Sequence, residues 1–216
     1  MIKTSRFQSF IHRTILPRGI SYISDISLEK GWEKRMINTD QKSISILSKQ
    51  NMDQPSLGVV ILSHPYLSDA KQFFLKNPHT QVYLENGFIV YLFDFNGFGE
   101  SRFTDFNYVQ DLDIVVKQGQ ALHPNLPLYL HGVSFGASNV INYSTTPNNL
   151  VSKIIVENCL DSNLNYYRLR NKKLFYSMKF IMKLFPHVNK HHDYTLSIKN
   201  LKNIEQVLLF TTPKTN

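Results

Sequence analysis

A chain of 216 residues, 42% of them apolar, is long enough to bury one sizeable core, and we expect a single large domain. Its one cysteine, Cys159, excludes an intramolecular disulfide and disfavours a cysteine-rich metal site, so we expect a reducing compartment. No apolar run is long enough to cross a bilayer or to form the core of a signal peptide, which makes cytoplasmic the predicted location.

The net charge of +8 is unevenly distributed along the chain. Residues 51–161 carry five basic and ten acidic side chains, whereas residues 162–216 carry ten basic and two acidic ones. A surface that binds the phosphate backbone of a nucleic acid needs basic side chains clustered on one face of a folded domain, together with a docking motif. Because the sequence has no zinc-finger spacing, RNP-type strand or helix-turn-helix pattern, nucleic acid is not a predicted partner.

Residues 1–30 lack a clean periodicity, and we expect an irregular or weakly helical lead-in before a domain of residues 31–216. Seven runs have the composition and length of strands. They are Trp32–Asn38, Ser43–Lys49, Gly58–Ser63, Phe88–Asp94, the run that begins at Leu128, Val151–Asn158 and Gln206–Thr211. The first two predict a hairpin, and the continuous apolar runs are typical of strands buried on both faces of a parallel sheet.

Helices are predicted between these strands. Ser68 or Asp69 is expected to cap a helix that passes through Leu75 and is split at Pro78. Asn86-Gly87 predicts a left-handed end for this helical region. Further helical patterns cover Val109–Leu122, the residues from Gly136 to about Tyr143, and Leu174–Phe185, where apolar residues recur on one face.

Strands that alternate with helices predict an α/β fold with a doubly wound, mostly parallel sheet. Ligands of such sheets bind at the carboxyl ends of the strands. His64, the segment 97–101, Ser134 and Asp161 all follow predicted strands. We therefore expect these residues to gather at one edge of the sheet.

The segment from Gly132 to Gly136 is a Gly-x-Ser-x-Gly motif between a predicted strand and a predicted helix. A tight turn in this context lifts a serine hydroxyl out of the sheet, where a base can reach it and make it nucleophilic. The two glycines leave room where a Cβ would meet a neighbouring strand or helix. The peptide N–H of Phe135, at the start of the helix, can point at a developing oxyanion. Ser134 is thus the predicted nucleophile.

Three motifs in this order resemble the α/β-hydrolase superfamily, in the branch of serine aminopeptidase-like and monoacylglycerol-lipase-like hydrolases. Gly58–Pro65 resembles the strand that ends in His-Gly at the oxyanion loop, Asp94–Ser101 resembles an Asp-x-Arg-Gly-x-Gly-x-Ser turn, and Gly132–Gly136 matches the nucleophile elbow. The resemblance covers residues 30–216. It implies an α/β-hydrolase fold with a helical cap insert at about 162–195.

The chain departs from the family pattern in two of these motifs. Pro65 stands where the family has a glycine, and proline has no N–H, so the resemblance implies oxyanion donors at the amides of Tyr66 and Phe135. Asn96 replaces the usual arginine, which removes a cation from the turn.

The larger departure concerns the general base. The family places its acid after the strand that Gln206–Phe210 resembles, and its histidine after one further strand, whereas residues 211–216 carry neither. The resemblance therefore implies a fold that lacks the last strand and helix. Three explanations stay open: the chain is truncated, it is a non-catalytic relative, or the base comes from elsewhere in the sequence.

Other residues could take these roles. Asp161 follows a strand after which some lipases of the superfamily carry their acid, and the alternative is a loop-capping aspartate. His187, His191 and His192 lie in the basic insert, where a lid could bring them over Ser134, and the alternative is a solvated face.

The predicted helix within the insert has two further features. Met178 and Met182 could line an acyl pocket, because methionine adapts to varied apolar ligands. The Lys/Arg face could contact anionic lipid headgroups at a membrane surface. The alternative is a cap helix packed on the sheet with its lysines in water.

The sequence thus predicts a serine hydrolase of esterase, lipase or peptidase type. It would act without a cofactor or a metal on a small-molecule or acyl-bearing substrate. Two hypotheses of other classes remain: a truncated or catalytically inactive hydrolase-fold binding protein, and a peripheral membrane-binding module.

Overall fold

The computed structural model of the chain describes residues 31–67, 69–162, 164–165, 168, 172–184 and 194–211. The lead-in expected at residues 1–30 lies outside this part of the chain. The strands are β1 (Glu33–Asn38), β2 (Ser43–Lys49), β3 (Gly58–Ser63), β4 (Phe88–Phe93), β5 (Leu128–Val133), β6 (Val151–Glu157) and β7 (Gln206–Phe210). The helices are α3 (Gln72–Leu75), α4 (His79–Glu85), α5 (Tyr108–Leu122), α6 (Phe135–Ser144), α8 (Lys172–Leu184) and α10 (Tyr194–Ile198). Each predicted strand is confirmed to within one residue at its ends.

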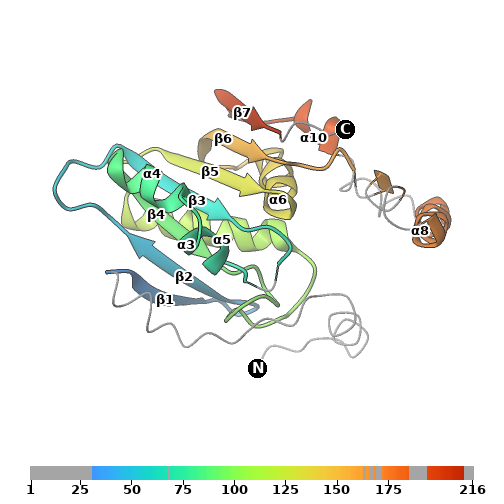
Figure 1. Cartoon of the computed structure of the whole chain (residues 1–216), viewed down its shortest axis with the longest axis horizontal. Coiled ribbons are helices and arrows are strands. Elements are labelled where there is room, and N and C mark those ends of the chain that lie inside the picture. Colours follow the sequence, from blue (N-terminus) through green and yellow to red (C-terminus); the bar gives the residue numbers. More distant parts are fainter. Residues whose placement is uncertain are drawn as a thin grey trace.

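The strands form one sheet in the order β1-β2-β4-β3-β5-β6-β7 (Figure 1). β1 and β2 form the predicted antiparallel hairpin, β2 pairs antiparallel with β4, and the strands from β4 to β7 run parallel. Parallel neighbours need crossover connections, which α4, α5 and α6 provide. The predicted α/β fold with a doubly wound, mostly parallel sheet is confirmed, and the carboxyl ends of β3, β4, β5 and β6 share one edge.

Helices cover both faces of the sheet: α3 and α4 lie on one face, and α5 and α6 on the other (Figure 1). All six residues of β3 are buried because this strand lies between the two layers. Val59 and Ile61 belong to the core under α5 and α6, whereas Val60 and Leu62 belong to the core under α3 and α4. This arrangement explains why the run is apolar at every position rather than alternating.

The start of α3 corrects one expectation. Asp69 does not cap this helix: the residue before α3 is Lys71, which makes no side-chain capping bond, and the Asp69 carboxylate pairs with Lys76 at 2.6 Å. The physical reason is a bend at Ala70, which has φ +46° and separates Asp69 from the first turn of the helix. Ser68, the other predicted cap, lies outside the described residues.

Two other helical predictions are confirmed. The amphipathic pattern expected over 174–185 corresponds to α8. The chain leaves α4 through Gly87, which has φ +78° as its left-handed role requires. The role of residues 162–195 as a cap remains a prediction.

Candidate active site

Ser134 lies in the turn between β5 and α6, at the carboxyl edge of the sheet. Its φ of +52° and ψ of −111° are a conformation that residues other than glycine rarely adopt. The peptide N–H of Ser134 donates to the carbonyl oxygen of Glu157 at 2.8 Å, and its carbonyl accepts from the N–H of Ser138 at 3.1 Å. The residue as a whole is half-buried.

Both glycines of the motif are required by close backbone contacts. A Cβ on Gly132 would lie 2.6 Å from the backbone nitrogen of Ala137, and a Cβ on Gly136 would overlap the carbonyl oxygen of Ser63. The first turn of α6 therefore packs directly against the end of β3. The predicted sequence of strand, tight turn and helix is confirmed.

Tyr66 and Phe135 come together beside this turn. Their rings meet edge to face with centroids 5.4 Å apart, and the Tyr66 ring also lies 5.3 Å from that of Phe98. Tyr66 follows β3, and Phe135 is the first residue of α6, so its N–H has no partner within the helix. The three predicted positions Ser134, Tyr66 and Phe135 are thus neighbours at one edge of the sheet.

Tyr108 extends this aromatic group and was not found from the sequence. Its ring lies 5.0 Å from that of Phe135, and its hydroxyl is buried without a hydrogen-bond partner among the described residues. Burial raises the pKa of this hydroxyl above its ordinary value, so it stays protonated at neutral pH. A buried hydroxyl without a hydrogen-bond partner among the described residues is uncommon, and this one is carried by a ring that packs against Phe135.

A buried carboxylate organises the turn of residues 94–101. Asp94 accepts hydrogen bonds from the peptide N–H groups of Lys71 and Glu100, and it pairs with the Lys71 ammonium. The side chains of Asp94 and Lys71 are 0% and 1% exposed. A Cβ on Gly99 would overlap the Asp94 carboxylate, which explains the second glycine of this motif.

Asn96 keeps its part of the turn without the arginine of the family pattern. Its amide nitrogen donates to Asp111 at 2.8 Å, and its amide oxygen accepts from the N–H of Thr104 at 3.1 Å. A cation is nevertheless present, because the buried ammonium of Lys42 pairs with Asp111 at 2.6 Å. Lys42, which directly precedes β2, thus supplies the positive charge that Asn96 lacks. The fold alone brings this lysine to the turn.

The histidines in the described part of the chain all have other partners. The Nδ1–H of His64 donates to the carbonyl of Pro65 at 2.7 Å, and its Nε2 accepts from the N–H of Phe95 at 3.1 Å. His79, His123 and His131 contact Glu157, Tyr91 and Tyr83 respectively. His187, His191 and His192 lie outside the described residues.

The remaining predicted site residues lie on the segments that follow β6. Asp161 is exposed, and its carboxylate accepts hydrogen bonds from the N–H of Ser162 at 2.6 Å and from the side chain of Asn165. Met178 and Met182 lie on α8, which stands apart from the sheet on the side toward which β3, β5 and β6 point (Figure 1). The position of the two methionine side chains lies outside what the structure describes.

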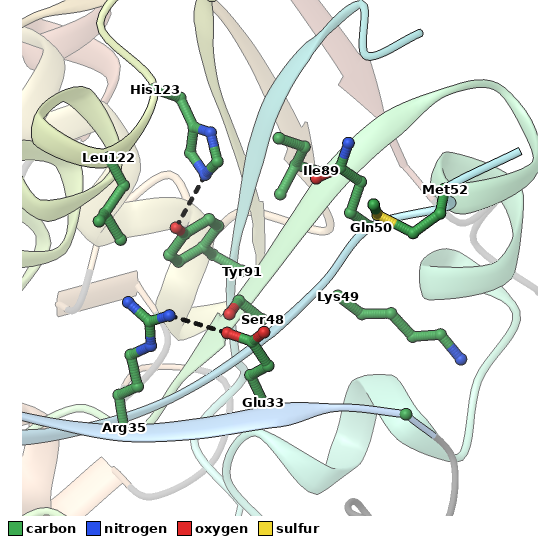
Figure 2. A pocket seen from close by; sticks show the side chains of 11 residues that line it. Glu33, Arg35, Ser48, Lys49, Gln50, Met52, Ile89, Tyr91, Leu122 and His123 are labelled. Atoms are coloured by element: carbon green, nitrogen blue, oxygen red, sulfur yellow. Dashed lines mark hydrogen bonds and ion pairs between the residues drawn. The ribbon is translucent and has the colours of Figure 1, made fainter. Parts of the chain in front are cut away.

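A pocket of about 360 Å³ lies elsewhere, beside the hairpin of β1 and β2 (Figure 2). Among the residues that line it, Arg35 pairs with Glu33 at 2.8 Å, and the hydroxyl of Tyr91 contacts His123 at 3.2 Å. His123 precedes β5, so this pocket lies toward the amino ends of the parallel strands, at the opposite edge from Ser134.

Comparison with known proteins agrees with this geometry. Residues 54–207 match the model of the family described as serine aminopeptidase, S33. The fold is that of an α/β hydrolase, and the chain belongs to the serine aminopeptidase S33 family. No curated protein sequence gives a significant match.

The chain is similar to two solved esterases. An esterase of Pyrococcus furiosus, Pf2001, matches with a TM-score of 0.61 and 17% identity over 91% of this chain and 87% of that one. A thermostable carboxyl esterase of Bacillus coagulans, solved with glycerol, matches with a TM-score of 0.54 and 18% identity over 68% of this chain and 51% of that one. At these identities the likeness establishes the fold.

Among the described residues, no helix combines the length and the apolar character needed to span a membrane.

Proposed function

We propose that the protein is a serine hydrolase that cleaves esters of small or acyl-bearing substrates, with Ser134 as the nucleophile. The observation that carries the proposal is the backbone of Ser134, a strained positive-φ turn between a strand and a helix that two glycines make room for. Strain of this kind costs about 1–3 kcal/mol and persists where the fold imposes it, typically at functional sites. A nucleophile elbow requires a strained backbone of this kind at the nucleophilic residue.

The same edge offers groups that could bind the developing oxyanion. The peptide N–H groups of Tyr66 and Phe135 are the proposed donors, and the rings of these two residues pack edge to face beside the turn. Fixed donors of this kind stabilise the transition state of acyl transfer more than the ground state.

The general base is proposed to come from outside the described residues, because His64, His79, His123 and His131 are engaged elsewhere. Of the histidines outside the described residues, we propose as candidates the three that lie between α8 and α10 in the sequence, at positions 187, 191 and 192. Asp161, which is exposed and whose carbonyl oxygen accepts the peptide N–H of Tyr194 at the start of α10, is the proposed acid partner. Replacing each histidine by alanine and measuring ester turnover identifies the base, if this chain supplies one.

A fluorophosphonate probe followed by peptide mass spectrometry tests the nucleophile directly. Covalent labelling at Ser134 in the folded chain is the expected result. Labelling of another residue would contradict Ser134 as the nucleophile. Absence of labelling in a folded sample would support the alternative of a catalytically inactive binding protein, which the engagement of the four described histidines favours.

A second candidate function, contact with anionic membranes, is favoured by the surface of α8. The side chains of Tyr176 and Phe180 are 66% and 63% exposed one turn apart, and the four lysines of this helix are exposed as well. Lysines beside exposed aromatic rings are typical of helices that lie at a membrane interface. Sedimentation with phosphatidylglycerol vesicles, compared with phosphatidylcholine vesicles, tests it: salt-sensitive binding only to the anionic ones is expected, and loss of it in Tyr176→Ser/Phe180→Ser assigns the contact to α8.

A further inference from the structure

Three residues with metal-binding side chains meet on the face of the sheet that α4 covers, away from the roles proposed above. His131 lies on β5, Glu157 is the last residue of β6, and His79 is the first residue of α4. Because Val133 pairs with Glu157 across the two strands, His131 and Glu157 lie on the same face, one step apart along the strands. The sheet and the helix thus bring together ligands that are up to 78 residues apart in sequence.

The distances suit a single ion. Oε2 of Glu157 lies 3.0 Å from Nε2 of His79 and 3.4 Å from Nε2 of His131. One candidate ligand atom from each residue lies within 4.8 Å of those of the other two. A tetrahedral Zn²⁺ site with metal–ligand bonds of about 2.0–2.2 Å places its ligand atoms roughly 3.3 Å apart.

The hydrogen bonding of His131 points the same way. The residue is 6% exposed, and its Nε2 has no hydrogen-bond partner among the described residues, although Oε2 of Glu157 lies 3.4 Å away. A buried imidazole nitrogen without a partner is uncommon and needs an explanation. The other ring nitrogen, Nδ1, lies 3.0 Å from the hydroxyl of Tyr83, an arrangement that fixes the ring as outer-shell partners of metal-binding histidines do.

The site is open on one side. The side chains of His79 and Glu157 are 19% and 28% exposed, so an ion can enter from solvent and keep a water molecule as a fourth ligand. Two imidazoles and a carboxylate suit Zn²⁺ and similar transition metals rather than Mg²⁺ or Ca²⁺, which take oxygen ligands.

We infer that His79, His131 and Glu157 bind one divalent transition metal ion, with Zn²⁺ the natural choice. The ion would join α4 to the ends of β5 and β6. The carbonyl oxygen of Glu157 accepts the peptide N–H of Ser134. A bound ion that holds Glu157 in place would therefore also stabilise the turn at Ser134. The inference does not depend on the hydrolase activity proposed above, since the cluster forms whether or not Ser134 reacts.

The test uses the full chain, stripped with a chelator and titrated with Zn²⁺ against a chromophoric competitor. We expect one ion per chain and a melting temperature that rises with Zn²⁺ but not with Mg²⁺. His79→Gln and Glu157→Gln should each weaken binding by more than about 100-fold, and Tyr83→Phe, which removes only the outer-shell hydroxyl, by about tenfold. His123→Gln is the matched control, because this histidine lies at the other edge of the sheet, and it should bind as the parent chain does.

Two results overturn the inference. One is the absence of Zn²⁺ binding by the folded chain. The other is binding that persists in His79→Gln and disappears instead when the closely spaced His187, His191 and His192 are replaced. His79 is the decisive position, because it lies at a partly exposed helix start where substitution leaves the core intact, which circular dichroism verifies.

Discussion

The backbone of Gly136 sits so close to the carbonyl oxygen of Ser63 that a side chain at position 136 would overlap that oxygen. Ser63 ends β3 and Gly136 lies in the first turn of α6, so this contact fixes the distance between the central strand and the helix that follows Ser134. The tight turn at Ser134 depends on it.

Gly136→Ala should therefore separate α6 from β3 and cost several kcal/mol of unfolding free energy, because a backbone carbonyl cannot move aside as a flexible side chain can. Urea denaturation followed by circular dichroism measures the loss. Gly119→Ala is the matched control: a Cβ there would find its nearest neighbour, Leu128, at 3.5 Å, and α5 would gain about 0.5–1 kcal/mol of helix propensity. Equal stability of the two variants would contradict the assigned packing.

The buried pair of Lys71 and Asp94 supports a second prediction. Lys71→Met removes the cation but leaves the carboxylate buried, which should destabilise the fold by about 3–5 kcal/mol. Lys76→Met provides the comparison, because Lys76 is 59% exposed in its pair with Asp69, and exposed pairs contribute about 0–1 kcal/mol. A Lys71→Met variant as stable as Lys76→Met would show that Asp94 is not organised by this pair.

His64 makes stability depend on pH. Burial, the largest effect, lowers its pKa from 6.5 to about 4, with Asp94 opposing and Lys71 assisting. Because the folded pKa lies below the unfolded one, the contribution of His64 is complete above pH 6.5 and is lost as the pH falls toward 4, a change of about 3 kcal/mol. NMR of the imidazole should show it neutral at pH 5, and a midpoint near 6.5 would contradict the burial. His123, partly exposed, serves as the reference resonance.

Much of the fold follows from patterns that are local in sequence. The continuous apolar run of residues 58–63 predicted a strand buried on both faces, and the alternation of strands and helices predicted the doubly wound sheet. Gly132 and Gly136 predicted the tight turn at Ser134, because only glycine tolerates such close backbone contacts. The sequence patterns behind these predictions each lie within a short stretch of the chain, although the backbone contact that requires Gly136 is with the distant Ser63.

Other features could not be predicted because they join distant segments. No sequence pattern marks Lys42 or Lys71, and only the fold brings them to buried carboxylates. The cap assigned to Asp69 was wrong because the chain bends at Ala70 before α3 begins. The cluster of His79, His131 and Glu157 likewise combines one helix and two strands.

Hydrolysis of short-chain p-nitrophenyl esters by the full chain, compared with its Ser134→Ala variant, tests the central claim most directly. We expect measurable turnover that falls by a factor on the order of 10⁴ or more in Ser134→Ala, and unchanged turnover in Ser152→Ala, a substitution near the amino end of β6. If the folded Ser134→Ala variant hydrolyses the ester as fast as the parent chain does, Ser134 is not the nucleophile and the assignment is contradicted.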